Sequence, residues 1–108
     1  MSKKIEFKYQ DTDYCLEYSR EAIKLMEKNG FQYEKFMKEP LTMGDLAFEG
    51  AFIKNHRSIK PALINEIYSS LKDKSKLTMT LLEMIQETYE DLYADNEDES
   101  KNTEWKIV

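Results

Sequence analysis

Residues 5–18 read IEFKYQDTDYCLEY, and this stretch decides the fold because it contains two runs in which apolar and polar side chains alternate. Alternate side chains of a β-strand point to the same face, so each run would present one apolar face. These faces would carry Ile5, Phe7 and Tyr9 in the first run, and Tyr14, Leu16 and Tyr18 in the second. The connection over 10–13 is short and contains aspartates, which predicts an antiparallel β-hairpin. Because an isolated hairpin is marginal in water, we expect it to pack on the helices that follow.

The first helix is expected over residues 20–29, where apolar side chains recur at helical spacing. Ser19 is placed to cap its first turn, because a serine hydroxyl accepts from N–H groups that a helix start leaves unpaired. Gly30 supplies the left-handed residue that commonly follows a helix. A short helical turn is expected over 32–38, and it should stop before Pro40 because a residue preceding proline avoids the helical region.

A second long helix is expected over residues 43–57, opened by Thr42 and Asp45, which resemble a capping box. Gly50 falls inside this helix, where glycine costs about 1 kcal/mol relative to alanine. We interpret Gly50 as a contact point, since the lack of a Cβ lets another segment approach closely.

Two more helices are expected over residues 62–71 and 77–93. Ser58 is a candidate cap for the first of them, and Pro61 suits its first turn, where no N–H group is needed. The second should begin at Leu77 or Thr78 and end near residue 94.

The predicted fold class is α+β, with an N-terminal antiparallel β-hairpin packed on a bundle of about four α-helices. A length of 108 residues is typical of one domain, which we assign to 1–94. Residues 95–108 are expected to form a flexible acidic tail that ends in a segment containing Trp105. That segment could add a strand to its own domain or dock on it, anchor a partner, or stay free.

The net charge of −5 is concentrated near the C-terminus. Residues 83–99 contain no Lys or Arg, and their acids are Glu83, Glu87, Glu90, Asp91, Asp95, Glu97, Asp98 and Glu99. This run is either a solvated helix end with its tail, or an acidic arm that docks on a basic partner or covers a binding face. Phosphate binding requires clustered Lys and Arg, which the sequence lacks, so nucleic acid is not an expected partner.

No residue pattern indicates catalysis or a cofactor. One Cys and one His exclude a tetrahedral zinc site built from these residues within one chain, and the acidic residues do not follow a calcium-loop spacing. No glycine-rich phosphate loop or nucleophile motif occurs. We therefore expect no enzyme, and no catalytic, cofactor-binding or metal-binding residues. His56 is expected to favour a helix C-terminus through the helix dipole, and Cys15 to be a small thiol that is buried or half-buried.

The sequence has no apolar run of the roughly 18 residues that span a bilayer, and its start lacks the apolar stretch of a signal peptide. A single cysteine cannot form an internal disulfide, which is typical of a reducing compartment. We expect a cytoplasmic protein that does not act at a membrane.

Several segments resemble a family of small proteins from phages and prophages of Gram-positive bacteria. The resemblance covers roughly residues 5–93, with its most specific parts at 30–31 and 50–52. The matching segments are 5–9, 13–20, 26–31, 48–57 and 64–68, and an acidic spacer followed by Trp105 also fits. Members of this group look like tail assembly chaperones of long-tailed phages.

The resemblance implies a helper in the cytoplasm of the bacterial host that binds the tape measure protein, keeps it soluble and helps to recruit tail tube subunits. It implies no catalytic residue. An apolar groove among the three later helices could hold a partner helix. The candidate partner-binding residues are Phe48, Phe52, Tyr68, Tyr89 and Trp105.

Two other functions remain open at this point. The protein could be a small virion component, such as a connector or completion protein, or an acidic regulatory or inhibitory phage protein that mimics DNA. The sequence also leaves open whether the chain forms a homo-oligomer.

Overall fold

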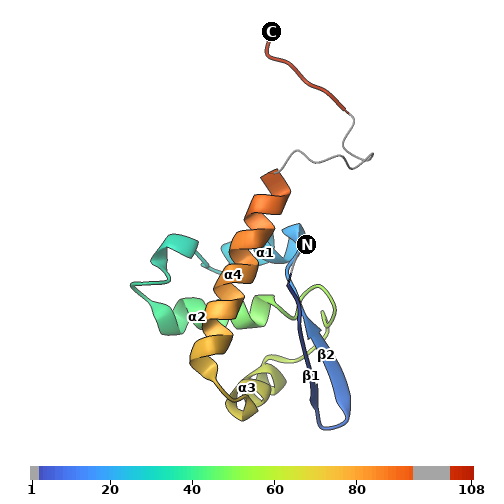
Figure 1. Cartoon of the computed structure of the whole chain (residues 1–108), viewed down its shortest axis with the longest axis vertical. Coiled ribbons are helices and arrows are strands. Elements are labelled where there is room, and N and C mark those ends of the chain that lie inside the picture. The colour runs from blue at the N-terminus through green and yellow to red at the C-terminus, as the bar shows by residue number, and fades with distance from the viewer. Residues whose placement is uncertain (1–2, 94–102) are drawn as a thin grey trace.

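The computed structural model describes residues 3–93 and 103–108. It begins with an antiparallel hairpin of β1 (Ile5–Tyr9) and β2 (Thr12–Leu16), followed by α1 (Arg20–Lys28) and a short 3₁₀ turn, η1 (Tyr33–Lys35). Three longer helices complete the order, namely α2 (Pro40–Gly50), α3 (Pro61–Ser70) and α4 (Lys74–Tyr93). The α+β prediction is confirmed, and Figure 1 shows the hairpin beside the helices.

The hairpin pairs Ile5 with Leu16 and Tyr9 with Thr12. Gln10 and Asp11 form its turn with positive φ angles of 47° and 65°, as the tightest hairpin turns require. The predicted four-residue connection is therefore too long, since the pairing already begins at Thr12. Leu16 is buried against the helices, whereas the apolar side chains of β1 are only half-buried.

The first helix was predicted to within one residue, since it begins at Arg20 and ends at Lys28, with Asn29 as its C-cap. The Ser19 hydroxyl accepts from the N–H of Ala22 at 3.1 Å, and Gly30 follows the helix with a φ of 106°. The N–H of Phe31 then donates to the Met26 carbonyl at 2.9 Å, which returns Phe31 to the core. Local capping chemistry is sufficient to define this element.

The predicted bounds of the second long helix are wrong. The helix starts at Pro40, whose missing N–H suits a first-turn position, so Thr42 lies inside the helix and does not cap it. It ends at Gly50, and the N–H groups of Phe52 and Ile53 then donate to the carbonyls of Glu49 and Gly50, three residues back, at 3.2 Å each. A continued α-helix would have bonded these N–H groups four residues back. The next carbonyl, that of Ala51, accepts from the N–H of Glu17 at 3.2 Å and so connects this turn to the end of β2.

The starts of α3 and α4 also differ from prediction. Lys60, and not Ser58, occupies the N-cap position of α3, with Pro61 following it as expected. Helix α4 begins at Lys74, before the predicted Leu77, because Asp73 adopts a φ of 55° and its carbonyl accepts from the N–H of Leu77. The predicted end near residue 94 and the boundary of the acidic tail lie outside the described residues.

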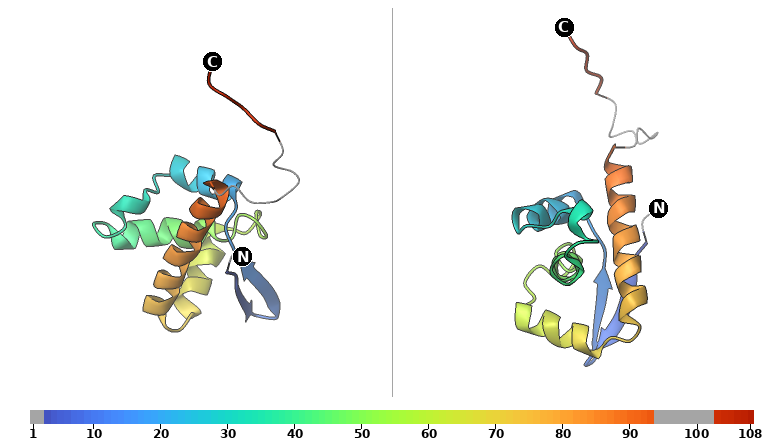
Figure 2. Two further views of the ribbon diagram at one scale, coloured as in Figure 1. Left: turned by 45° about the horizontal axis from the view of Figure 1, so that its top comes forward. Right: turned by 90° about the vertical axis from the view of Figure 1, so that its left-hand side faces the viewer.

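The helices and the hairpin enclose one apolar core. In the right-hand view of Figure 2, α1, α2 and α3 form one layer, and the hairpin and α4 lie along its other side. The core includes Leu16 from β2, Met26 from α1, Phe52 after α2, Ile67 from α3 and Ile85 from α4. Among the described residues, no helix combines the length and apolarity needed to cross a bilayer.

Candidate partner-binding surface

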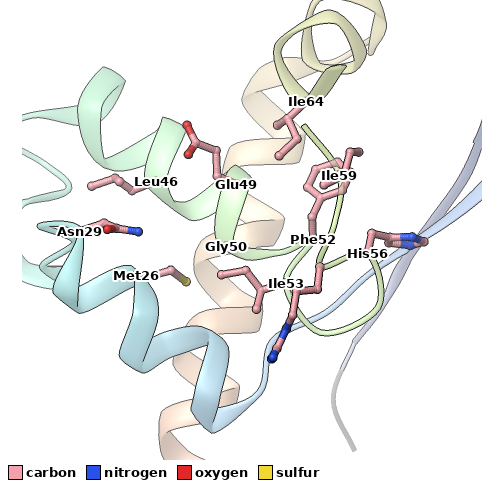
Figure 3. A pocket seen from close by; sticks show the side chains of 11 residues that line it. Met26, Asn29, Leu46, Glu49, Gly50, Phe52, Ile53, His56, Ile59 and Ile64 are labelled. Atoms are coloured by element: carbon pink, nitrogen blue, oxygen red, sulfur yellow. The ribbon is translucent and has the colours of Figure 1, made fainter. Parts of the chain in front are cut away.

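A hollow of about 160 Å³ opens where α1, α2 and the start of α3 meet the turns that follow α2. Figure 3 shows apolar side chains inside it and polar groups at its edge. The lining is Met26, Asn29, Leu46, Glu49, Gly50, Phe52, Ile53, His56, Arg57, Ile59 and Ile64. We call this feature the α2–α3 hollow. Its volume is below the roughly 300–1,000 Å³ of pockets for drug-sized ligands, so it suits one apolar side chain better than a small molecule.

Close packing of α1 on α2 forms one wall of this hollow. A Cβ on Gly50 would overlap the Sδ and Cγ atoms of Met26, and Met26 is itself buried. The prediction that Gly50 is a contact point is confirmed. Leu46, Ile53 and Ile59 remain partly exposed around the opening.

The turn that carries Ile53 is held by a polar network to the end of β2. Glu17 is buried, and its carboxylate accepts from Asn55 Nδ2 at 2.9 Å and from Lys54 Nζ at 3.0 Å. Asn55 also donates to the Cys15 carbonyl at 3.1 Å. The hydrogen bond from Asn55 and the pairing with Lys54 lower the pKa of Glu17 although burial opposes them.

His56 belongs to the same junction. Its Nε2 accepts from the N–H of Cys15 at 3.0 Å, and its ring lies 5.0 Å from the Tyr14 ring. The predicted placement at a helix C-terminus is wrong, because α2 ends at Gly50 and His56 follows irregular turns. His56 instead has a structural role as the hydrogen-bond acceptor that holds the main chain of β2.

Cys15 is half-buried, as predicted. Burial, together with the nearby charge of Glu17, raises the pKa of its thiol. His56 bonds to the main chain of Cys15, and the Sγ atom lies 3.9 Å from Glu17 Oε2. This environment opposes the thiolate that a cysteine nucleophile needs.

The lowered pKa of Glu17 predicts acid sensitivity. Because the carboxyl pKa is lower in the folded chain than its ordinary value of 4.5, the stabilisation is complete above that value and is lost as the pH falls through the folded pKa. We expect Glu17→Gln to lower the free energy of unfolding at pH 7 by about 1 kcal/mol. Urea denaturation between pH 7 and pH 3 should show a shallower loss of stability in the variant than in the native chain.

Glu21→Gln provides the matched control, because Glu21 pairs with Arg57 at 2.6 Å on an exposed surface. Such pairs contribute about 0–1 kcal/mol, so this variant should keep the native pH dependence. Parallel curves for native chain and Glu17→Gln would contradict the role assigned to Glu17.

The residues that the sequence predicted to bind a partner differ widely in how exposed they are. Phe48 and Phe52 are 2% and 1% exposed, and their rings pack 5.1 Å apart in the core. The prediction of an open groove is therefore wrong for Phe48, and Phe52 reaches the α2–α3 hollow only as part of its floor. Helical spacing marks an inward face without showing whether another element covers it. Tyr68 is half-buried, with its ring 5.2 Å from that of Phe48. Trp105 is 82% exposed, and no strand forms around it in residues 103–108.

Tyr89 is also half-buried, and it faces α1 rather than the predicted groove. Its hydroxyl donates to Glu27 Oε2 at 2.8 Å, and its ring makes an edge contact with Tyr33 at 6.5 Å. Burial, followed by the hydrogen bond to Glu27, raises the pKa of Tyr89 to about 12, so the hydroxyl remains a donor at neutral pH.

Sequence reasoning missed Ile59 as a lining residue. Ile53 and Ile59 flank a polar turn, and Ile59 lies outside every predicted helix, so their convergence depends on how that turn folds back. The sequence feature that could have indicated this site is a pair of isoleucines, one on each side of the polar residues 54–58.

Across residues 3–93 and 103–108, no three His, Cys, Asp or Glu side chains are grouped so that they could hold a metal ion. The described residues also contain no buried side-chain nitrogen or oxygen atom without a hydrogen-bond partner. What the structure offers is an apolar hollow with a polar edge.

Comparison with known proteins identifies the family. No curated protein and no solved structure is significantly similar to this chain. A family model described as "Domain of unknown function (DUF5055)" matches residues 1–108, and the chain therefore belongs to the DUF5055 family.

Proposed function

We propose that this protein is a phage tail assembly chaperone-like protein that holds another polypeptide, the tape measure protein or a tail tube subunit, while the tail is built. The observation that carries the proposal is the α2–α3 hollow, whose size fits one apolar side chain. A helix that docks in such a place inserts anchor residues at helical spacing and leaves its polar face in water.

The edge of the hollow supports a protein partner. Asn29, Glu49 and Arg57 are exposed there and provide donors and acceptors around the apolar floor. An apolar centre with a polar rim is the usual composition of a protein interface. The net charge of −5 would also help to keep a complex with an apolar partner dispersed.

The test is co-expression with the tape measure protein of the same phage or prophage. The native chain should keep the tape measure protein in the soluble fraction. The double variant Leu46→Glu/Ile53→Glu should weaken binding about tenfold or more, because it places charges where the apolar anchor would be buried.

Met79→Glu is the matched control, since Met79 is exposed on α4 outside the hollow. Circular dichroism of each variant checks that the fold is retained. A tape measure protein that stays insoluble with excess native chain would contradict the proposal. Detection of this protein in purified particles by mass spectrometry would favour a virion component instead.

A further inference from the structure

A second concave surface lies between α1 and the last turns of α4. Its volume is about 400 Å³, and its lining is Arg20, Ile23, Lys24, Glu27, Tyr89, Leu92 and Tyr93. We call it the α1–α4 furrow. It shares no lining residue with the α2–α3 hollow, so the two surfaces can be tested separately.

The furrow leaves apolar surface uncovered at the end of α4. Tyr93 is 87% exposed, and Leu92 is also exposed beside it. Ile23 contributes an apolar floor from α1, and the charged lining residues are Arg20, Lys24 and Glu27, the last of which accepts from the Tyr89 hydroxyl. Within residues 3–93 and 103–108, neither Arg20 nor Lys24 forms an ion pair.

The segment 103–108, which we call the C-terminal arm, has the complementary composition. In an extended chain, Trp105 and Ile107 point to one side, while Glu104 and Lys106 point to the other. Both apolar side chains are uncovered, at 82% and 88% exposure. Tryptophan is among the residues most enriched at the energetic centres of protein interfaces.

We infer that the C-terminal arm of one copy occupies the α1–α4 furrow of a second copy. Trp105 and Ile107, which share one side of the extended arm, pack against Ile23, Leu92 and Tyr93, and Glu104 and Lys106 on the other side remain in water.

A second copy is the favoured source of the arm in the furrow, because the arm lies away from its own domain, along the long axis of the molecule (Figure 1). Each copy has one arm and one furrow, so two copies that exchange arms satisfy both. Such reciprocal exchange closes into a two-fold symmetric dimer. The inference is independent of the proposed function, because it concerns the protein without its partner.

Trp105 is the only tryptophan, so its fluorescence reports directly on the arm. In the native chain we expect sedimentation velocity to show dimers as the protein concentration rises. Over the same concentrations the tryptophan emission should shift to shorter wavelength, and its quenching by iodide should fall. Leu92→Glu should weaken self-association about tenfold or more. Met79→Glu, on the same helix but outside the furrow, should not change it.

A mixing experiment separates exchange between copies from docking within one chain. The Trp105→Ala variant keeps its furrow but has no tryptophan, and Leu92→Glu keeps its arm but has a damaged furrow. Mixing them should move the tryptophan emission to shorter wavelength, because the arm of the second enters the furrow of the first.

Two results would overturn the inference. Emission that is protected at every concentration and unaffected by mixing would place the arm on its own domain. Emission typical of a fully exposed tryptophan at every concentration would show that the arm does not bind in the furrow. Neither measurement involves the tape measure protein, so failure here is distinguishable from failure of the chaperone proposal.

Discussion

Replacing Phe52 by alanine is expected to lower the free energy of unfolding by about 3–5 kcal/mol, the range found for large aromatic deletions in protein cores. Phe52 is 1% exposed, and its ring lies 5.1 Å from Phe48 and 6.0 Å from Tyr14. These contacts join the end of α2 to the hairpin, so their loss leaves a cavity at the junction of the two. Urea denaturation monitored by circular dichroism measures the effect.

Phe7→Ala is the matched control, because it removes the same atoms from a half-buried position on β1. Its ring stacks on Tyr14 at 5.3 Å but remains open to solvent on its other side. The loss of stability should therefore be clearly smaller than for Phe52→Ala. Equal losses, or a loss below about 1 kcal/mol for Phe52→Ala, would contradict the core position of Phe52.

This result also affects how partner binding is tested. If Phe52 stabilises the core, its replacement weakens partner binding by unfolding the protein, and the variant says nothing about the surface. Leu46 and Ile53 are better probes, because they are partly exposed at the α2–α3 hollow.

The elements that sequence predicted well are those fixed by neighbouring residues. Ser19 and Gly30 act within one turn of α1, and Pro61 sets the start of α3 through its own missing N–H. The end of α2 was not predictable in this way. The turns that replace the helix after Gly50 pack against β2, where the Ala51 carbonyl accepts from the N–H of Glu17, 34 residues away in the sequence.

The candidate site was less predictable than the fold for a related reason. Apolar periodicity identified the side of each helix that faces inward, and both Phe48 and Phe52 do face inward. Whether such a side is closed or open depends on the elements packed against it. The α2–α3 hollow forms where Ile53 and Ile59 converge across an irregular turn. The spacing of apolar residues does not predict the course of such a turn.

Two glycines of α2 should respond to alanine in opposite directions. Gly50→Ala should lower the free energy of unfolding by about 2 kcal/mol, since the new Cβ would overlap Met26 and overpacking typically costs 1–3 kcal/mol. Gly44→Ala should raise it by up to about 1 kcal/mol, because the nearest atom to a Cβ there is Phe36 Cζ at 4.0 Å and alanine favours the helix. Parallel urea denaturation curves measure both.

The sign of the Gly50 effect depends on whether Met26 can move away. Its Sδ and Cγ both lie in the path of the new Cβ, so a rotation at the end of the side chain does not suffice. The open space beside Met26 is the α2–α3 hollow, which Met26 already lines. A Met26 side chain displaced into that space would fill it, so Gly50→Ala should also weaken partner binding, whereas Gly44→Ala should not. If Gly50→Ala stabilised the chain as Gly44→Ala does, α1 and α2 would not be in the close contact that forms this wall of the hollow.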